Sequence, residues 1–307
     1  MAQILVTAKI NPDLDGTACA LAYAYFLNEH GNDAEGMIFG SPQAEVSYFI
    51  DQHGISIPTR PDNTKGDWTQ FVLVDASEMK GMPTVVTPEQ VIEVIDHRAG
   101  SEPEKQFSYA YIQNELVGAA ATLVTERFMR AGLRPSRENA LLLYGAIHHN
   151  SLNFLATNTH RRDHDTVRFL EQEYGFDKKI IEEMFHYATD VICKDVVQAI
   201  VNDAKEFGTG YVIAPCQLIV WGRDVLLQTE GFDEGIENVR EHVGAQWGFL
   251  NIVDVHTGTT SIYVRDSKGA MLLSRALELP ISTGLTRLPM TILRKQIIPK
   301  LYAVLPR

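Results

Sequence analysis

The stretch AKINPDLDG, from Ala8 to Gly16, lies between an apolar segment, QILVTA, and a helical pattern, CALAYAYFLNEH. This order predicts a strand, a tight acidic loop and then a helix. Asp13 and Asp15 are therefore expected at the mouth of a sheet, where oxygen ligands for a cation are often placed. Lys9 stands four residues before Asp13, and its ammonium would compete with a metal ion for these acids. The loop thus raises the question of whether it binds a metal at all.

Outward from this loop, strand and helix patterns alternate through the N-terminal part of the chain. Such alternation predicts an α/β domain, a parallel sheet with helices on both faces. The predicted strands are Ile4–Thr7, Gly36–Phe39, Phe71–Val74 and Val91–Ile95, and the predicted helices are Thr17–Glu29, Ala44–Gln52, Gly118–Ala131, Arg137–Ala146 and Asp163–Glu173.

The pattern changes to short strands from Tyr211 onward, with YVIAPCQLIV, GFLNIVDV and TSIYVR and one helix over Phe232–His242. A chain of 307 residues is also long for a single core. We therefore predict an N-terminal domain over residues 1–187, a linker over 188–196 and a smaller α+β domain over 197–307.

Composition narrows the class of protein. The net charge of −12 argues against sequence-independent duplex binding, which needs a dominant basic surface, so no nucleic-acid partner is expected. The apolar run Ala18–Leu27 is too short to span a bilayer, and the first residues lack the features of a secretory signal. Three scattered cysteines form no metal or disulfide pattern. We expect a cytoplasmic protein without a membrane partner.

Acids stand at the ends of three predicted strands. FVLVD ends at Asp75, VIEVID ends at Asp96, and the first strand leads into Asp13 and Asp15. Each acid taken singly fits a helix N-cap or a loop position. Together at one sheet edge they would repel unless a cation neutralised them, and His97 adds an imidazole that suits transition metals. The combination favours a metal site.

These motifs resemble the DHH phosphoesterase superfamily, through NPDLD before a helix, VD at Asp75 and IDHR at Asp96–Arg98. Within it, the chain resembles the branch of manganese-dependent (class II) inorganic pyrophosphatases and exopolyphosphatases along nearly its whole length. The glycine-rich GGGH element of oligonucleotide-cleaving relatives is missing from the sequence. The further segments that carry the resemblance are FGSPQAEVSYFI, ELVGAAATLVTERF, GAIHHNSLNFLATNTHRRD, NDAKEF and RKQIIPKL.

The resemblance implies a two-metal site with altered ligands. Lys9 occupies the position of a family histidine, and Arg98 replaces the third member of DHH, a substrate-contacting histidine. Asp96 matches the acid that supports the ligating histidine. Lys9, Asp96 and Arg98 are the candidate catalytic residues. The candidate metal ligands are Asp13, Asp15, Asp75, His97 and Asn150, with His149 as the alternative to Asn150 in the last position.

The resemblance also implies a DHHA2-like second domain that binds substrate. Lys205, Arg294 and Lys295 match its cationic positions and join Arg98 as candidate substrate-binding residues, whereas Leu293 replaces a family arginine. The implied cofactor is Mn²⁺, with Mg²⁺ or Co²⁺ as alternatives. A small phosphate compound is the implied substrate, and a homodimer joined through the N-terminal sheet is the implied assembly.

Two functions stay open at this point. The first is a metal-dependent hydrolase of a phosphoanhydride or phosphoester, with one divalent ion on Asp15, Asp75 and His97 and the Lys9 ammonium in place of its partner. The second is a catalytically impaired relative that binds a phosphorylated ligand or a partner protein. It is favoured by departures from the family at four matched positions, Lys9, Asn150, Arg98 and Leu293. A nuclease is disfavoured by the net charge.

Overall fold

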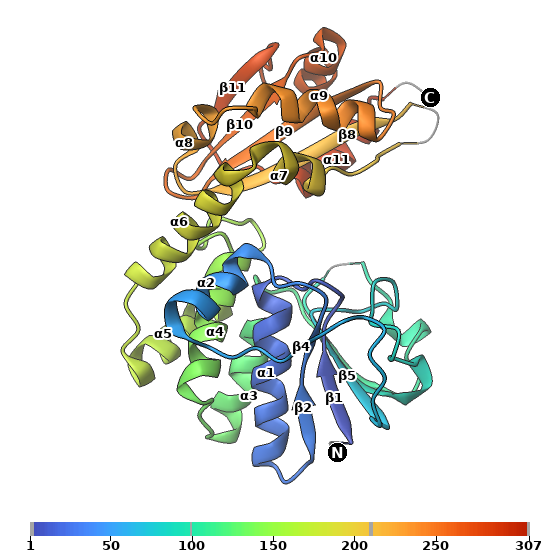
Figure 1. Cartoon of the computed structure of the whole chain (residues 1–307), viewed down its shortest axis with the longest axis vertical. Helices are drawn as coiled ribbons and strands as arrows, with labels where there is room; N and C mark the ends of the chain where they lie inside the picture. The colour runs from blue at the N-terminus through green and yellow to red at the C-terminus, as the bar shows by residue number, and fades with distance from the viewer. Residues whose placement is uncertain (1–2, 99, 209–210, 306–307) are drawn as a thin grey trace. The chain divides into compact units, whose positions relative to one another are not determined.

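The chain divides into two compact units, Met1–Met184 and Phe185–Arg307, in a computed structural model that describes residues 3–98, 100–208 and 211–305. Figure 1 shows each unit as a sheet with helices packed on it. The predicted α/β class with a smaller second α+β domain is confirmed.

The first unit is built on a five-stranded parallel sheet with the strand order β2-β1-β5-β6-β7. The inner strands β1 and β5 are buried almost throughout, because helices cover both faces of a parallel sheet. A short parallel pair, β3 with β4, lies beside it. The bounds are β1 Ile4–Thr7, β2 Ala34–Gly36, β3 Ile38–Phe39, β4 Thr59–Arg60, β5 Gln70–Val74, β6 Val91–Asp96 and β7 Tyr111–Asn114.

The helices of this unit begin close to the predicted positions. The first helix packs mainly on α4, α3 and the neighbouring strands. Every residue from Leu14 to Ala24 is buried except Leu21, which is half-buried. The bounds are α1 Leu14–Glu29, α2 Ala44–His53, α3 Ala120–Ala131, α4 Arg137–Asn150, α5 Arg161–Tyr174 and α6 Lys179–Lys194, with short 3₁₀ turns at Pro88–Gln90 and Pro103–Lys105.

The predicted strand Gly36–Phe39 is instead the end of β2 and the whole of β3, with a break at Met37. The strand β7 was not predicted. Its sequence, YIQN, alternates too weakly to signal a strand, because β7 lies at the edge of the sheet and pairs only with β6.

The second unit is a four-stranded mixed sheet with the order β11-β10-β9-β8, in which β8 and β9 are parallel and the other pairs antiparallel. Alternate residues of β9 enter two cores: Phe249 packs with residues of α10 and α11, and Leu250 packs with residues of α7 and α9. The bounds are α7 Val196–Asp203, β8 Ile213–Val220, α8 Arg223–Leu227, α9 Phe232–His242, β9 Trp247–Asp254, β10 Thr259–Val264, α10 Ser267–Leu277, β11 Gly284–Leu288 and α11 Arg294–Tyr302.

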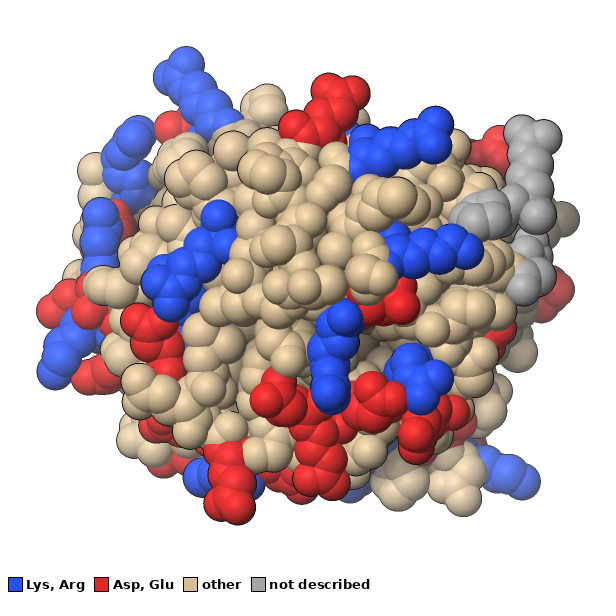
Figure 2. Space-filling view, turned by 90° about the horizontal axis from the view of Figure 1, so that it is seen from above, with Lys and Arg blue, Asp and Glu red and all other residues tan. Residues whose placement is uncertain are grey.

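The division between the units falls inside α6, and the segment 188–196 consists of the end of α6, Asp195 and the first residue of α7. Acidic and basic side chains are interspersed among uncharged residues on the face that Figure 2 shows. Among the described residues, no helix combines the length and the apolar character that a membrane span requires.

Candidate metal centre

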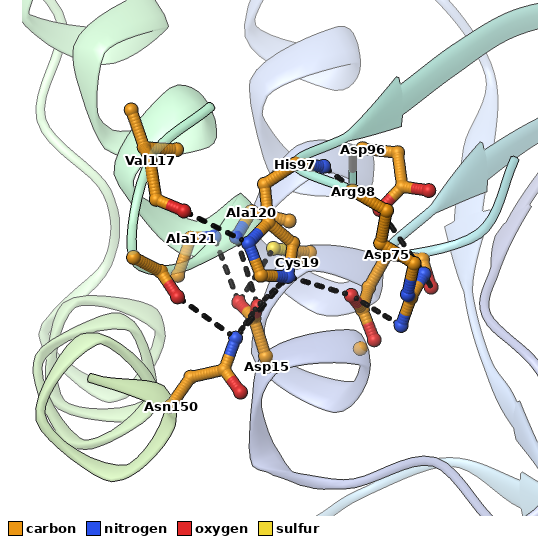
Figure 3. A network of polar contacts seen from close by, with 12 residues as sticks. Asp15, Cys19, Asp75, Asp96, His97, Arg98, Val117, Ala120, Ala121 and Asn150 are labelled. Carbon is orange, nitrogen blue, oxygen red and sulfur yellow. Dashed lines mark hydrogen bonds and ion pairs between the residues drawn. The ribbon is translucent and has the colours of Figure 1, made fainter. Parts of the chain in front are cut away.

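Three side chains from separate segments converge at the carboxyl ends of β1, β5 and β6 (Figure 3). Asp15 lies in the first turn of α1, Asp75 directly follows β5, and His97 directly follows β6. One ligand atom of each residue lies within 4.8 Å of the others. The parallel sheet places them together, because neighbouring parallel strands end at the same edge.

Asp15 is fully buried and held by the start of α3. Its two carboxylate oxygens accept the backbone N–H groups of Ala120 and Ala121, both at 2.8 Å. The thiol of Cys19 donates to the same carboxylate at 3.7 Å. Burial and the nearby charge of Asp75 raise the pKa of Asp15 to about 8, although the charge of His97 opposes them. The N-terminus of α3 thus fixes the side chain without neutralising it.

Asp75 adopts a left-handed backbone conformation, with φ of 50°, which is uncommon for a residue other than glycine. Its backbone N–H donates to Ile95 at 2.9 Å, so pairing with the neighbouring strand holds this conformation. Burial alone would raise the pKa of Asp75, but the hydrogen bond from His97 and the charge of Arg98 outweigh burial and lower it. Of the two carboxylates, Asp15 and Asp75, it is therefore Asp75 that stays ionised.

His97 turns its Nε2 atom toward the two acids, at 3.4 Å from Asp75 Oδ1 and 3.7 Å from Asp15 Oδ2. Its Nδ1 atom lies 3.0 Å from the carbonyl oxygen of Val117. Because a carbonyl can only accept, Nδ1 carries the hydrogen and Nε2 is the atom available to a metal. Burial would lower the pKa of His97, but Asp75 and Asp15 outweigh it and raise the pKa.

Asn150 closes the group from the end of α4. Its Nδ2 atom donates to Asp15 Oδ2 at 2.9 Å and to the carbonyl oxygen of Gly118 at 3.1 Å, and it lies 3.3 Å from His97 Nε2. The Gly118 carbonyl fixes the amide orientation, since only the NH₂ end can face it. The nitrogen of Asn150, not its oxygen, therefore faces Asp15 in this structure.

Arg98 bridges two of the acids. Its guanidinium pairs with Asp75 Oδ1 at 2.9 Å and Asp96 Oδ1 at 3.0 Å, and it also donates to the main-chain oxygen of Asp75. Asp96 is fully buried and accepts the backbone N–H of His97 at 2.8 Å. The ring of His97 is thus oriented by Val117, whereas Asp96 supports its backbone. This division of roles was not expected from the sequence.

The remaining candidates of this unit lie outside the three-residue group. Asp13 is the N-cap of α1 and accepts the backbone N–H groups of Asp15 and Gly16, both at 3.1 Å. Lys9 Nζ lies 3.5 Å from Glu78 Oε1. Burial and the charges of Asp75 and Glu45 raise the pKa of Asp13 to about 6. Of the two alternatives for the last ligand position, Asn150 is the one that contacts Asp15.

In the second unit, Arg294 is bound by an internal carboxylate. Its guanidinium makes a two-pronged ion pair with Asp203, at the C-terminal end of α7, and also donates to the main-chain oxygens of Asp203 at 3.0 Å and Pro215 at 3.3 Å. Lys205 and Lys295 are exposed, and Leu293 is buried just before α11. The charge of Arg294, like that of Arg98, is therefore already compensated by internal carboxylates.

The residues that sequence reasoning missed act through their backbones. Val117, Gly118, Ala120 and Ala121 supply the carbonyls and N–H groups that hold His97, Asn150 and Asp15. The available signal was the run of small residues GAAAT, which opens α3 and lets its backbone approach Asp15 closely.

The group is suited to one divalent transition-metal ion. Two carboxylates and one imidazole form a mixed oxygen and nitrogen donor set, compatible with Mn²⁺. The bond between His97 Nδ1 and a main-chain carbonyl is the supporting contact that metal-ligating histidines usually have. Asp15, Asp75 and His97 could thus hold such an ion.

Comparisons with known proteins agree with this geometry. Residues 3–147 match the family described as DHH family, N-terminal domain. The chain is 28% identical, over 97% of both chains, to a protein of Exiguobacterium sp. named "Probable manganese-dependent inorganic pyrophosphatase". A Bacillus cereus protein of the same name is 28% identical over 98% of both chains.

Solved structures share the fold. A Methanococcus jannaschii "putative family II inorganic pyrophosphatase" superposes with a TM-score of 0.73 at 20% identity, covering 98% of this chain and 99% of the other. An exopolyphosphatase-related protein of Bacteroides fragilis gives a TM-score of 0.53 at 12% identity, covering 99% and 91%. Residues 3–147 thus match the DHH family, and along nearly its whole length the chain is similar in sequence to proteins named as probable manganese-dependent inorganic pyrophosphatases.

Proposed function

We propose that this protein is a manganese-dependent hydrolase of a small phosphoanhydride or phosphoester, of the inorganic pyrophosphatase or exopolyphosphatase type. The observation that carries the proposal is the buried convergence of Asp15, Asp75 and His97. The names of the full-length relatives support the metal and the substrate class. The cytoplasm as location is part of the same proposal.

Asp15, Asp75 and His97 would hold the ion. When bound, a divalent ion supplies positive charge that acidifies water and stabilises charge on phosphate oxygens. The carboxylate of Asp15 is already oriented by the backbone N–H groups at the start of α3. His97 would bind the ion through Nε2, because its Nδ1 is hydrogen-bonded to the carbonyl of Val117. His97 must lose its Nε2 proton to ligate, so binding releases a proton and strengthens as the pH rises through its pKa.

Arg98 is the residue of this unit best suited to contact a phosphate oxygen. Its side chain is 38% exposed and lies beside Asp75, so its guanidinium borders the metal group. It has N–H groups beyond those that pair with Asp75 and Asp96. Lys205, Arg294 and Lys295 are included as substrate-binding residues because their segments resemble those of the family.

Binding without turnover is the second candidate function. The observation that favours it is the orientation of Asn150, whose amide nitrogen donates to Asp15. The pairing of Arg294 with Asp203 also favours it, because an anion would have to displace this carboxylate. A chain with these features could bind a phosphate compound and hydrolyse it slowly or not at all.

A phosphate-release assay with Mn²⁺ separates the two functions. Pyrophosphate, tripolyphosphate and long-chain polyphosphate would be offered to the native protein and to Asp75→Asn. Metal-dependent release by the native protein alone supports the hydrolase. Binding of pyrophosphate without phosphate release supports the second function. If the native protein shows no binding and no release, both proposed functions are ruled out. Metal analysis of the same preparation is expected to find one ion per chain.

A homodimer joined along β7 is the proposed assembly. β7 is an edge strand of the parallel sheet, and the large side chains of Tyr109, Tyr111 and Leu116 beside it are strongly exposed. An exposed strand edge of this kind can pair with a second copy. Light scattering of the native protein and of Tyr111→Lys would test it, with a dimer and a monomer as the expected states.

A further inference from the structure

We propose that Asp163 is a positioning residue that sets the geometry and the metal affinity of the candidate centre through the segment 117–121. The metal part of this inference rests on the proposed function, whereas the positioning part does not. Asp163 belongs to the charged run HRRDHD at the start of α5, and it is fully buried although its neighbours Arg161 and His164 are not.

The carboxylate of Asp163 is saturated with hydrogen bonds. The backbone N–H of Gly118 donates to both of its oxygens, at 3.0 and 2.8 Å. The hydroxyl of Thr122 donates at 2.5 Å, and the backbone N–H of His160 donates at 2.6 Å. Two of these three donor groups come from the segment that begins α3, so Asp163 ties that segment to α5.

Gly118 shows how close this contact is. A Cβ atom at this position would lie 2.7 Å from Asp163 Oδ2, closer than real Cβ atoms come to another atom, and 3.0 Å from its Cγ atom. A side chain at position 118 would therefore displace the carboxylate, and glycine allows its close approach. The position of the Gly118 backbone follows directly from the position of Asp163.

The segment 117–121 in turn holds three members of the centre. The Val117 carbonyl accepts from His97 Nδ1, and the Gly118 carbonyl accepts from Asn150 Nδ2. The N–H groups of Ala120 and Ala121 hold Asp15. One buried carboxylate, which touches none of these three side chains, thus determines where all of them lie. Groups that hydrogen-bond a metal ligand directly commonly change metal affinity by about 10- to 100-fold when removed, and Asp163 holds the segment that supplies such groups.

The variant Asp163→Asn tests the proposal, because an amide can replace only one of the two accepting oxygens. The matched control is Asp254→Asn in the second unit. Asp254 is also a buried carboxylate that accepts several backbone N–H groups, those of Gly222, Arg223, His256 and Thr257. A loss of general stability would therefore appear in both variants.

The first readout is the ¹⁵N NMR spectrum of the histidine rings in metal-free protein, with the signal of His97 assigned from its loss in His97→Gln. Asp163→Asn is expected to shift this signal and Asp254→Asn to leave it unchanged. The second readout is Mn²⁺ affinity, measured from the EPR signal of free Mn²⁺. We expect a loss of about 10- to 100-fold in Asp163→Asn and less than about twofold in Asp254→Asn.

Unchanged His97 signals and unchanged Mn²⁺ affinity in folded Asp163→Asn would overturn the proposal. If the native protein binds no Mn²⁺, the proposed function fails and the NMR readout alone decides on Asp163. If Asp163→Asn does not fold, Thr122→Val takes its place, since it removes one donor and keeps the shape of the side chain. A smaller shift of the His97 signal is then expected, and no shift would contradict the positioning role.

Discussion

The two units handle charge at their polar centres in opposite ways. In the first unit, Asp15 and Asp75 approach one another around His97, with Asp15 fully buried. In the second unit, Arg294 is paired with the carboxylate of Asp203 and with main-chain oxygens. The first centre sets three carboxylates, those of Asp15, Asp75 and Asp96, against Arg98 and His97, whereas the second sets one carboxylate against Arg294.

This difference shows which ligand each centre can accept. The first centre gains free energy from an added cation, because burial and mutual repulsion raise the pKa of Asp15. The second centre gains little free energy from an added anion, because the carboxylate of Asp203 must first be displaced from Arg294. We therefore expect the first centre to bind a metal ion more readily than the second centre binds a phosphate group.

The largest effect is expected from Asp75→Asn. Asp75 carries the negative charge nearest to both His97 and Arg98, so its loss removes a ligand and leaves Arg98 opposing the ion. Loss of a group that only supports a ligand lowers metal affinity by up to about 100-fold. Asp75→Asn should lower Mn²⁺ affinity by more than that. Titration calorimetry measures this change. Native-like affinity would show that the metal does not bind at this group.

Acid should destabilise the first unit through His148, which is buried on α4. Burial lowers its pKa to about 4, despite the hydrogen bond to Asn153 at 2.8 Å. Unfolding exposes the ring, which then binds a proton near its ordinary pKa of about 6.5. Protonation below that value therefore favours the unfolded chain, and stability is lost as the pH falls toward 4.

The free energy of unfolding should drop by about 2 kcal/mol between pH 7 and pH 5 from His148 alone. Urea unfolding of the native protein and of His148→Gln at both pH values isolates this contribution as a difference. The exposed His30 gives the control variant, His30→Gln. Equal pH dependence in the native protein and His148→Gln would rule out this origin of acid sensitivity.

Asn150→Asp should sharpen the excess of negative charge. It replaces an N–H donor with a carboxylate next to Asp15 Oδ2, which lies 2.9 Å from the present nitrogen. We expect Mn²⁺ affinity to rise by about tenfold, since carboxylates bind hard cations better than amides do. Metal-free protein should lose about 1–3 kcal/mol of stability because the donor to Asp15 is lost. Asn63→Asp, at an exposed position, controls for added charge, and a gain of stability without metal would contradict this account.

Asp203→Asn should make the second centre more receptive to anions. It removes the charge that competes for Arg294, and the amide oxygen can still accept the N–H of Gln217. Pyrophosphate affinity is expected to rise by up to about fivefold, the range for a partly exposed ion pair. Asp233→Asn, at an exposed acid in the same unit, is the control. If affinity falls instead, Asp203 helps to present Arg294 rather than to compete for it.

The smallest effect is expected from Lys9→Ala. Its ion pair with Glu78 spans 3.5 Å between partly exposed side chains, and such pairs contribute at most about 1 kcal/mol. Thermal unfolding and Mn²⁺ affinity should both stay near the native values. A large change in Mn²⁺ affinity would mean that the Lys9 ammonium reaches the acids, as the sequence suggested.

The sequence was most informative where side chains carry the signal. The strand Ile4–Thr7 and the helix Phe232–His242 were predicted with their observed bounds. The strand is an unbroken apolar run, and the helix has a clear apolar periodicity. β7 was missed because an edge strand needs little apolar pattern. The placement of Asp15, Asp75 and His97 at strand ends could be anticipated from topology, although their role as ligands stays a prediction.

The rest of the centre could not be read from residue types. Val117 orients His97 through a main-chain carbonyl, which every residue possesses, so nothing in its side chain signals the role. The orientation of Asn150 depends on the carbonyl of Gly118, 32 residues earlier in the chain. The charge run HRRDHD gave no sign that Asp163 alone is buried, because burial depends on packing against α3.

The way α3 holds Asp15 has a consequence for a protein deprived of its ion. Backbone groups fix this carboxylate before any metal arrives, so little conformational entropy remains to be lost on binding. Treatment with a chelator should therefore leave a folded, dormant protein that regains manganese within a single mixing step. Scarcity of the ion would thus leave the protein folded and able to bind the ion again.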